Sequence, residues 1–314
     1  MSESHGTGKY ERVLARCKEV PAITTAVAHP CDEASLGAVI EAAHAGILRP
    51  ILVGPADRIR RVAKDLDLDV DEYEIEDAPH SDASAARAVE LVRQGRAEVL
   101  MKGSLHTDEL MSAVVKKDTG LRTSRRVSHA FVLDVPTYHK VLTVTDAAVN
   151  IFPTLDDKRD IVQNAIDFMR AVGVERPKVA ILSAVETVTS KIPSTIDAAA
   201  LCKMADRGQI EGGVLDGPLA FDNAISAEAA RIKKIASPVA GDPDVLVVPD
   251  LEAGNILVKN LNFLSRADAA GVVLGARVPI ILTSRADNER TRMASCAVAA
   301  LYAHARRRRA AVAA

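Results

Sequence analysis

Hydrophobic positions along the chain follow two alternating patterns, which predict strands followed by helices. Short apolar runs such as residues 23–28 (ITTAVA) and 50–54 (PILVG) are typical of strands that are buried on both faces. The segment 33–45 between them carries its apolar residues at helical spacing. Because this alternation is typical of a parallel sheet covered by helices on both faces, it predicts an α/β fold.

The same alternation continues to the end of the chain. A helix is expected over residues 81–94, with Ser81 as its N-cap, and another over 194–207, beginning at a Ser/Thr cap. Further strands are expected at residues 97–102, 130–135, 141–145, 178–182, within 209–217, and at 245–248, 271–274 and 278–283. Further helices are expected at residues 57–66, 156–172, 253–267 and 288–307.

Composition decides what can fill the core. The chain has 314 residues, of which 48% are hydrophobic but only 3% aromatic, and it contains no Trp. The core is therefore expected to consist of Ala, Val, Ile and Leu. The length suits two domains, but no Pro/Gly-rich or low-complexity linker marks a boundary between them.

Charge and cysteine usage narrow the class of protein. The net charge is −2, from 40 basic and 42 acidic residues, which favours neither nucleic acid nor an anionic membrane as a partner. The four cysteines are far apart, so we expect reduced thiols and no bound metal. The first residues lack the apolar core of a signal peptide, and no apolar run approaches the ~20 residues that span a bilayer. These features predict a cytoplasmic protein.

Several common catalytic signatures do not occur in the sequence. There is no GxxxxGK[ST] phosphate loop, no GxGxxG after a strand, no HExxH and no GxSxG. Three histidines in the middle of the chain, His106, His129 and His139, have no metal-ligand spacing and are expected at the surface or as hydrogen-bonded core residues.

Polar clusters instead follow predicted strands, at the edge of an α/β sheet where ligands bind. Lys102, Gly103 and Ser104 follow one strand and combine a cation, a close-approach glycine and a hydroxyl. Arg122 and Arg125 belong to a run, RTSRR, whose guanidinium groups suit an anionic ligand; the alternative is a solvated loop.

Two more clusters lie farther along the chain. The segment 128–150 contributes Ser128 and, at the polar end of a strand, Asp146 and Asn150. Asn255 lies near the start of a predicted helix, where backbone N–H groups favour anions; an ordinary capped turn is the alternative.

The most specific cluster is the run 282–289, LTSRADNE, in which a strand leads directly into Ser284, Arg285 and Asp287. A hydroxyl and a guanidinium can stabilise an oxyanion, and a carboxylate can accept a proton, so this trio suits acyl transfer to or from phosphate. The alternative interpretation is a helix N-terminus in which Asp287 favours the helix dipole.

Taken together, these clusters resemble the phosphate acetyltransferase and phosphate butyryltransferase family over nearly the whole chain. The resemblance rests on six stretches in the family's order: MKGSLHT, GLRTSRRVSHAFVLDVP, VTDAAVNIFP, DGPLAFDNAIS, SPVAGDPDVLVVPDLEAGN and PIILTSRAD. The details LRTSR, VSH and LTSRAD look closer to the butyryltransferase branch.

The resemblance implies two three-layer α/β/α domains that flank a cleft, like isocitrate and isopropylmalate dehydrogenases but without their nicotinamide cofactor. The first domain would comprise residues 1–128 and 274–314. Residues 129–273 would be inserted as a second, dimerising domain, giving a homodimer or a higher homo-oligomer. Coenzyme A enters as a substrate, and no cofactor is expected.

The reaction that the resemblance implies is acyl-CoA plus phosphate giving acyl phosphate plus CoA, by direct attack in a ternary complex. Arg285 would bind phosphate and developing negative charge, and Ser284 would polarise the acyl carbonyl. The acetyltransferase branch carries its catalytic aspartate a turn beyond the arginine, where this chain has Thr291. The base is therefore expected to be Asp287, Glu289 or a residue peculiar to this branch. Contacts with phosphate or CoA are expected from Lys102, Arg122, Arg125, Ser128, Asp146, Asn150 and Asn255.

Three other functions compete with this interpretation. An acyl-carrier-protein-dependent phosphate acyltransferase of the same fold would need a more apolar cleft and a basic surface for its partner. A non-catalytic, CoA-sensing domain would have lost the Ser-Arg pair, which is present here. A nicotinamide-dependent hydroxyacid dehydrogenase would need metal-binding aspartates and a cofactor loop, neither of which we find.

Overall fold

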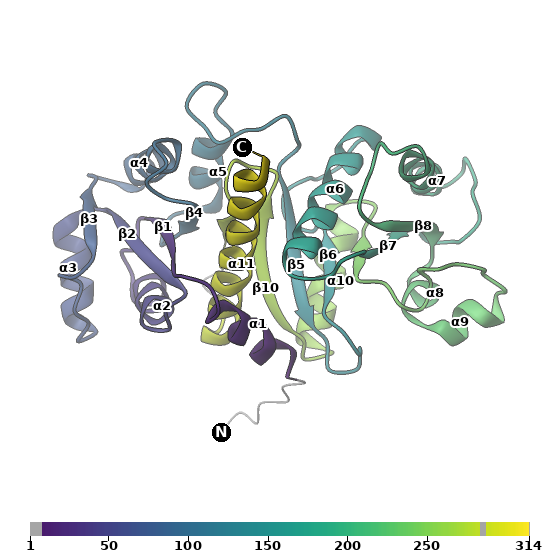
Figure 1. Ribbon diagram of the computed structural model, residues 1–314, viewed down its shortest axis with the longest axis horizontal. Helices are drawn as coiled ribbons and strands as arrows, with labels where there is room; N and C mark the ends of the chain where they lie inside the picture. Colours follow the sequence, from purple (N-terminus) through teal and green to yellow (C-terminus); the bar gives the residue numbers. More distant parts are fainter. Residues whose placement is uncertain (1–7, 283–286, 314) are drawn as a thin grey trace. The chain divides into compact units, whose positions relative to one another are not determined.

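The computed structural model describes residues 8–282 and 287–313, and its helices and strands alternate along the chain (Figure 1). The chain divides into two compact units. The flanking unit comprises Tyr10–Arg125 and Ala270–Ala314, and the middle unit comprises Met1–Lys9 and Arg126–Ala269. The chain thus enters and leaves the middle unit as an insertion, which explains why no linker is visible in the sequence.

The flanking unit is built on a mostly parallel sheet. Its strands, in spatial order, are β3 (Glu74–Asp77), β2 (Leu48–Gly54), β1 (Ile23–Ala28), β4 (Val99–Lys102), β11 (Ile280–Ile281) and β10 (Asp268–Leu274). The pair β10 and β11 is antiparallel, and the other neighbours are parallel. Because parallel strands need crossover connections, helices separate them in the sequence.

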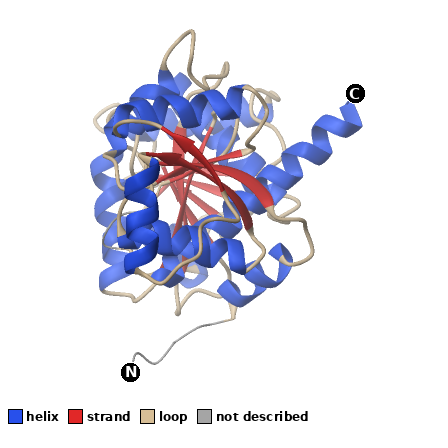
Figure 2. Ribbon diagram, turned by 90° about the vertical axis from the view of Figure 1, so that its left-hand side faces the viewer, coloured by secondary structure: helices blue, strands red, loops and turns tan. Residues whose placement is uncertain are grey.

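Helices cover both faces of this sheet (Figure 2). They are α1 (Lys9–Cys17), α2 (Glu33–His44), α3 (Ala56–Asp65), α4 (Ser81–Arg93), α5 (Thr107–Val115) and α11 (Glu289–Ala313). Helix α2 contacts α3 and α11, whereas α4 contacts α5. The Asp32 side chain caps α2 by accepting a hydrogen bond from Ser35 N at 2.8 Å.

The register of the flanking sheet brings three strand ends to one edge. Ala28 of β1 pairs with Lys102 of β4, and Met101 of β4 pairs with Ile281 of β11. The residues that follow β1, β4 and β11 therefore emerge side by side at the carboxyl edge, which is the ligand-binding edge of open α/β sheets.

The middle unit repeats this architecture around β5 (Ser128–Asp134), β6 (Leu142–Thr145), β9 (Val245–Val247), β7 (Lys178–Leu182) and β8 (Val214–Leu219), in that spatial order. Strands β5 and β6 are antiparallel, and the others are parallel. Its helices are α6 (Leu155–Ala171), α7 (Pro193–Asp206), α8 (Phe221–Ile225), α9 (Ala227–Ile232) and α10 (Leu251–Phe263).

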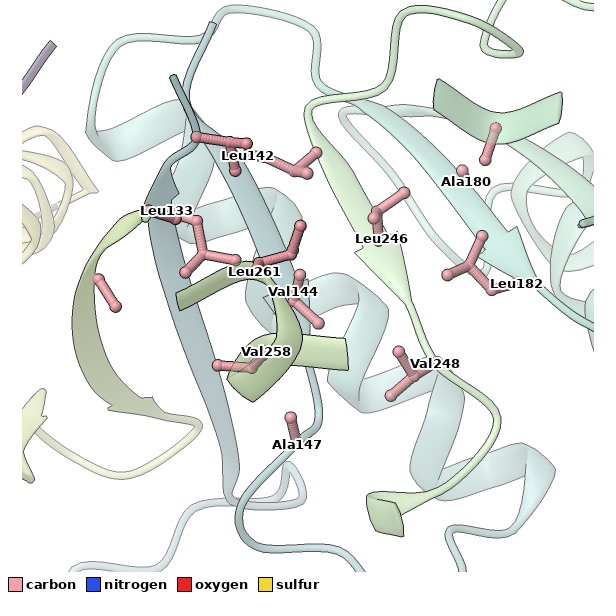
Figure 3. Packing of buried hydrophobic residues seen from close by; sticks show 14 of the residues in the cluster. Leu133, Leu142, Val144, Ala147, Ala180, Leu182, Leu246, Val248, Val258 and Leu261 are labelled. Atoms are coloured by element: carbon pink, nitrogen blue, oxygen red, sulfur yellow. The ribbon is translucent and has the colours of Figure 1, made fainter. Parts of the chain in front are cut away.

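Aliphatic side chains fill the core of the middle unit, as the composition predicts. Leu133, Val144 and Leu246 from neighbouring strands meet Val258 and Leu261 from α10 (Figure 3). Val, Ile and Leu have stiff, well-defined rotamers and suit such close packing between a sheet and a helix.

Several details differ from the sequence-based expectation, which places no element at α1, β3, α5, α8 or α9. Helix α4 is capped by His80, whose Nδ1 accepts from Ala83 N at 3.3 Å, and Ser81 is the first helical residue, so its expected capping role is wrong. Helix α7 begins at Pro193 without a side-chain cap, because the fixed φ of proline already suits the first helical position. The expected strand over 278–283 is confirmed only for Ile280–Ile281.

Candidate functional site

Lys102 ends β4 with its side chain folded back over the strand end. The residue is buried, and Nζ donates to the carbonyls of Leu105 at 3.0 Å and Gly103 at 3.2 Å. A buried ammonium group must be hydrogen-bonded, and these carbonyls hold it in place. The expected cation is therefore present at the carboxyl edge of the flanking sheet.

Gly103 and Ser104 join the end of β4 to the end of β1. Gly103 N donates to Ala28 O at 2.8 Å, and Ser104 donates to His29 O from both its N–H, at 2.8 Å, and its hydroxyl, at 2.9 Å. A Cβ on Gly103 would lie 2.5 Å from the carbonyl oxygens of Ala28 and His29. Only glycine fits this close approach, as the sequence suggested.

The arginine run lies on an anchored loop after α5. Thr123 Oγ1 donates to Gly275 O at 2.6 Å and accepts from Arg125 N at 3.1 Å. The side chains of Arg122 and Arg125 are exposed. Exposed guanidinium groups on a fixed backbone suit recognition of phosphate oxygens.

Arg126, the third arginine of the run, belongs to the middle unit and is used within it. Its Nε donates to Asn150 Oδ1 at 2.7 Å, and its backbone N donates to Asp160 Oδ2 at 2.9 Å. Its guanidinium also lies 3.6 Å from Asp157. These contacts help to order the turn that carries Asn150.

Asp146 organises the turn after β6. Its carboxylate accepts hydrogen bonds from the backbone N of Ala148 at 2.9 Å, Val149 at 3.0 Å and Asn150 at 3.3 Å, and from Asn150 Nδ2 at 2.6 Å. It also accepts from His129 N at 3.3 Å. With 3% of the residue exposed, this carboxylate is nearly sealed. Asp146 and Asn150 hold the loop in shape.

Ser128, at the start of β5, has no exposed surface. Its hydroxyl accepts from Asn164 Nδ2 at 3.0 Å, and the same Nδ2 donates to Arg126 O at 2.9 Å. These contacts tie β5 to α6. A substrate contact by Ser128 stays a prediction.

His129 is a sealed core residue with an unmet hydrogen-bonding group. It is 2% exposed, and Nδ1 is one of two sealed side-chain polar atoms without a partner in the described part of the chain. Burial lowers the pKa of His129 to about 4, against an opposing effect of Asp146, so the ring is neutral at pH 7. The expectation of a surface or hydrogen-bonded histidine missed this unmet atom.

Asn255 lies in the first half of α10, whose N-cap Asp250 accepts from Ala253 N at 2.9 Å. The half-buried Asn255 amide donates to Ala147 O at 3.4 Å. A Cβ on Gly254 would lie 2.8 Å from the Ala147 Cβ, so glycine lets α10 pack closely against the same turn. Asn255, Asp146 and Asn150 are thus gathered around one loop.

Of the predicted trio Ser284, Arg285 and Asp287, the structure describes only Asp287. Ser284 and Arg285 lie outside the described residues, and Asp287 is half-buried. The next residue, Asn288, caps α11 by accepting from Thr291 N at 2.7 Å. Asn288 is therefore the residue that caps the start of α11, which was the alternative interpretation of this run.

Glu289, a second candidate for the base, is engaged with another carboxyl group. It shares a hydrogen bond with Glu41 of α2, and burial together with this contact raises the pKa of Glu41 to about 7. Glu289 is therefore engaged with another acidic group, which weakens its candidacy as the base.

The described residues carry neither a metal centre nor a transmembrane helix. Nowhere among them do three or more His, Cys, Asp or Glu side chains converge as a metal site would require. Across residues 8–282 and 287–313, each helix is too short or too polar to cross a bilayer.

Comparison with known proteins identifies the family. A family model described as "Phosphate acetyl/butaryl transferase" matches residues 81–300. A phosphate acetyltransferase of Rhizobium meliloti is 68% identical over 98% of this chain and 96% of its own length. A phosphate butyryltransferase of Clostridium beijerinckii is 43% identical over 94% of this chain and 97% of its own length.

Solved structures agree with these relatives. A branched-chain phosphotransacylase from Enterococcus faecalis V583 superposes with a TM-score of 0.78 at 30% identity, covering 90% of this chain and 99% of that one. A 4-hydroxythreonine-4-phosphate dehydrogenase from Klebsiella pneumoniae, at a TM-score of 0.54 and 16% identity over 90% of this chain and 99% of that one, shares the fold alone. The chain therefore belongs to the phosphate acetyltransferase and phosphate butyryltransferase family.

Proposed function

We propose that this protein catalyses the reversible transfer of a short acyl group between coenzyme A and inorganic phosphate, in the cytoplasm and without a cofactor. The observation that carries the proposal is the 68% identity to a phosphate acetyltransferase along almost the entire chain. The exposed Arg122 and Arg125 on an anchored loop support a phosphate-bearing substrate.

In this proposal the acyl group and phosphate react directly in a ternary complex. Arg285 binds phosphate and developing charge, Ser284 polarises the acyl carbonyl, and Asp287 is the carboxylate of the motif. Contacts with phosphate or CoA come from Lys102, Arg122, Arg125, Ser128, Asp146, Asn150 and Asn255. Asp146 and Asn150 also hold the loop after β6 in shape.

The finer architecture is part of the same proposal. The two units correspond to two three-layer domains of the isocitrate and isopropylmalate dehydrogenase type, with a cleft for the substrates and boundaries near residues 128 and 274. The middle unit dimerises. Its exposed apolar residues Ile256, Phe263 and Leu264, on and just after α10, support this assembly, since such patches mark interaction surfaces.

The length of the acyl group stays open to measurement. The chain is 68% identical to a relative named as an acetyltransferase and 43% identical to one named as a butyryltransferase. Its motifs nevertheless resemble the butyryltransferase branch. However, an acetyltransferase of Thermotoga maritima is only 41% identical, so names do not follow identity. One methylene in an apolar pocket is worth about 1–3 kcal/mol, which a few substitutions can reverse.

The test is phosphate-dependent release of CoA from acetyl-, propionyl-, butyryl- and branched acyl-CoA, with Arg285→Ala and the matched control Arg61→Ala on the exposed side of α3. We expect release that requires phosphate, falls by about 10²–10³-fold in Arg285→Ala and is unchanged in Arg61→Ala. Binding of CoA without release would favour the sensor domain. Activity only with acyl-acyl carrier protein would favour the lipid-type acyltransferase.

A further inference from the structure

His29 follows β1 directly and has a backbone conformation that few residues adopt. Its φ is 57°, in the left-handed region that residues other than glycine rarely adopt. Its N–H donates to Val53 O at 2.7 Å, and its carbonyl accepts from Ser104 and Cys31. These bonds hold the strained backbone, and through it the ring, in one place.

The hydrogen bonds of the ring determine its tautomer. Nδ1 lies 3.0 Å from Ser84 Oγ, and Ser84 Oγ lies 2.8 Å from His80 O. A carbonyl oxygen can only accept, so the single hydroxyl hydrogen of Ser84 points to His80. Nδ1 of His29 must therefore carry a hydrogen and donate it to Ser84, which leaves the lone pair on Nε2.

Nε2 has no hydrogen-bond partner among the described residues, and it is not one of their sealed, unpaired atoms. The sealed, unpaired side-chain atoms in that part of the chain are His129 Nδ1 and Asn223 Oδ1. His29 as a whole is only 6% exposed. A basic nitrogen thus carries a lone pair that no described residue uses, while the residue as a whole is packed.

The surroundings keep this nitrogen unprotonated near neutral pH. Burial lowers the pKa of His29, and Arg58 and His80 lower it further, against the opposing carboxylates of Glu109 and Asp32. A lowered pKa keeps the acceptor in its basic form at physiological pH, as proton transfer to it requires.

Ser84 cannot be a nucleophile activated by this histidine. Its side chain has no exposed surface, and its hydrogen is given to a backbone carbonyl. The serine therefore orients the ring, in the way that a buried hydrogen-bond acceptor fixes the tautomer of a catalytic histidine.

His29 lies on the edge of the flanking sheet that also carries Lys102, Gly103 and Ser104. Because Ala28 pairs with Lys102, His29 is next to Gly103 across the strand pair. Strand β11 lies on the other side of β4, so the ends of three strands share this edge.

We propose that Nε2 of His29 is the proton acceptor of the acyl transfer, an inference that rests on the proposed function. A phosphate oxygen forms a bond to the acyl carbon, the carbon–sulfur bond breaks, and the phosphate O–H proton passes to Nε2. The imidazolium returns this proton to the CoA sulfur, which leaves as the thiol. In reverse, Nε2 takes the thiol proton and delivers it to phosphate.

A proton acceptor other than a carboxylate is needed unless Asp287 serves, because the other positions near the Ser-Arg motif are poor candidates for this role. Thr291 occupies the position of the aspartate of the acetyltransferase branch, and Glu289 is paired with Glu41. Asp287 remains the competing acceptor, so it is the second residue to be tested.

The variant His29→Asn isolates Nε2. Asparagine tolerates a positive φ, and its amide nitrogen can replace Nδ1 as the donor to Ser84, but it has no atom at the Nε2 position. The matched control is His44→Asn, at the exposed end of α2. Asp287→Asn is measured alongside, and each kcat/KM is divided by that of the wild type at the same pH, which cancels the ionisation of phosphate and CoA.

We expect kcat of His29→Asn to fall by about 10²–10³-fold at pH 7.5, with KM changed less than about threefold. The ratio of variant to wild type should rise as the pH falls through the lowered pKa of His29, because protonation disables only the wild-type acceptor. His44→Asn should behave as the wild type. Activity that persists in His29→Asn, or falls equally at every pH, overturns the inference, as does a pH-dependent loss confined to Asp287→Asn.

Two readouts separate this inference from the proposed function. If the wild type transfers no acyl group to phosphate, the proposed function fails with it. Nitrogen-15 chemical shifts of the His29 ring report the tautomer without any reaction. A hydrogen on Nε2 instead of Nδ1 would overturn the assignment even in an active enzyme.

Discussion

Lys9 Nζ lies 2.9 Å from Asp134 Oδ1, and both side chains are almost sealed, at 3% and 9% exposure. The same ammonium donates to Val135 O at 2.9 Å and Tyr138 O at 2.7 Å. The start of α1 is therefore attached to the end of β5 by a fully hydrogen-bonded buried charge.

Lys9→Met should destabilise the middle unit strongly. Removing one partner of a buried ion pair leaves the other charge uncompensated, which costs about 3–5 kcal/mol. Urea unfolding followed by circular dichroism measures this loss. The matched control is Lys203→Met, whose pair with Asp206 is 65% and 63% exposed and should matter by less than about 0.5 kcal/mol. Equal stability of the two variants would contradict this account.

Asp146→Ala should disorder the loop after β6. Three backbone N–H groups and the Asn150 amide would lose their acceptor, and each buried donor left unpaired costs about 1–3 kcal/mol. We expect faster amide hydrogen exchange at residues 148–150, together with a lower free energy of unfolding. Unchanged exchange at these amides would show that other groups hold the loop.

Gly103→Ala and Gly37→Ala should change stability in opposite directions. A Cβ at Gly103 would meet backbone oxygens at 2.5 Å, so the ends of β1 and β4 must separate, at about 1–3 kcal/mol, and activity should fall as His29 moves. A Cβ at Gly37, within α2, meets nothing within 4 Å and should add about 0.5–1 kcal/mol. Thermal unfolding of both variants is the measurement, and stabilisation by Gly103→Ala would contradict the close approach.

The cysteine thiols should be unreactive in the folded protein. Burial raises the pKa of Cys17, Cys202 and Cys296 to about 12 and that of Cys31 to about 11. At pH 8 only roughly one thiol in 10³–10⁴ is then ionised, and the thiolate is the reactive form. Labelling with a thiol reagent should be slow until urea is added, and activity should survive alkylation. Rapid loss of activity would instead indicate an essential thiol.

The Glu41–Glu289 pair should make the flanking unit more stable in mild acid than in mild base. Burial and the contact with Glu289 raise the pKa of Glu41 to about 7, above its unfolded value, so the folded state binds more protons between about pH 4.5 and 7. The free energy of unfolding therefore falls as the pH rises through this range.

Glu41→Gln should remove this dependence. It should be more stable than the wild type at pH 8, by on the order of 1 kcal/mol after solvent screening, and should gain nothing at pH 5. Glu33 and Arg292 line the same hollow and remain in place. Chemical unfolding at both pH values, with Glu289→Gln in parallel, checks the pair; an equal effect of Glu41→Gln at both pH values would show that the two carboxyl groups do not share a proton.

Local pattern was sufficient for the α/β fold class and for many of the helices and strands. The apolar runs that became β1, β2 and β7, and the helical spacing that became α2, depend on residues close in sequence, so they can be recognised without a structure. The six motifs in order identified the family, because each reflects residue types that one site requires.

Prediction from local pattern failed for residues whose role depends on a contact with another part of the chain. Ser81 looked like the cap of α4, but His80 caps the helix and Ser81 donates to Glu109. The sequence gives no reason to select His29, a single histidine after a strand. Its role depends on Ser84, 55 residues away, and on the strand register beside Gly103.

The sequence by itself thus determined the fold class, the family and the polar residues available for chemistry, since hydrophobic periodicity and motif order are properties of the chain. Only the tertiary structure decided which of those residues remain accessible. It turned Asp146 and Ser128 inward to hydrogen-bond donors in their own unit and left one nitrogen of His29 without a partner among the described residues. The physical reason is that burial and hydrogen-bond pairing are set by contacts between segments far apart in sequence, which no local pattern records.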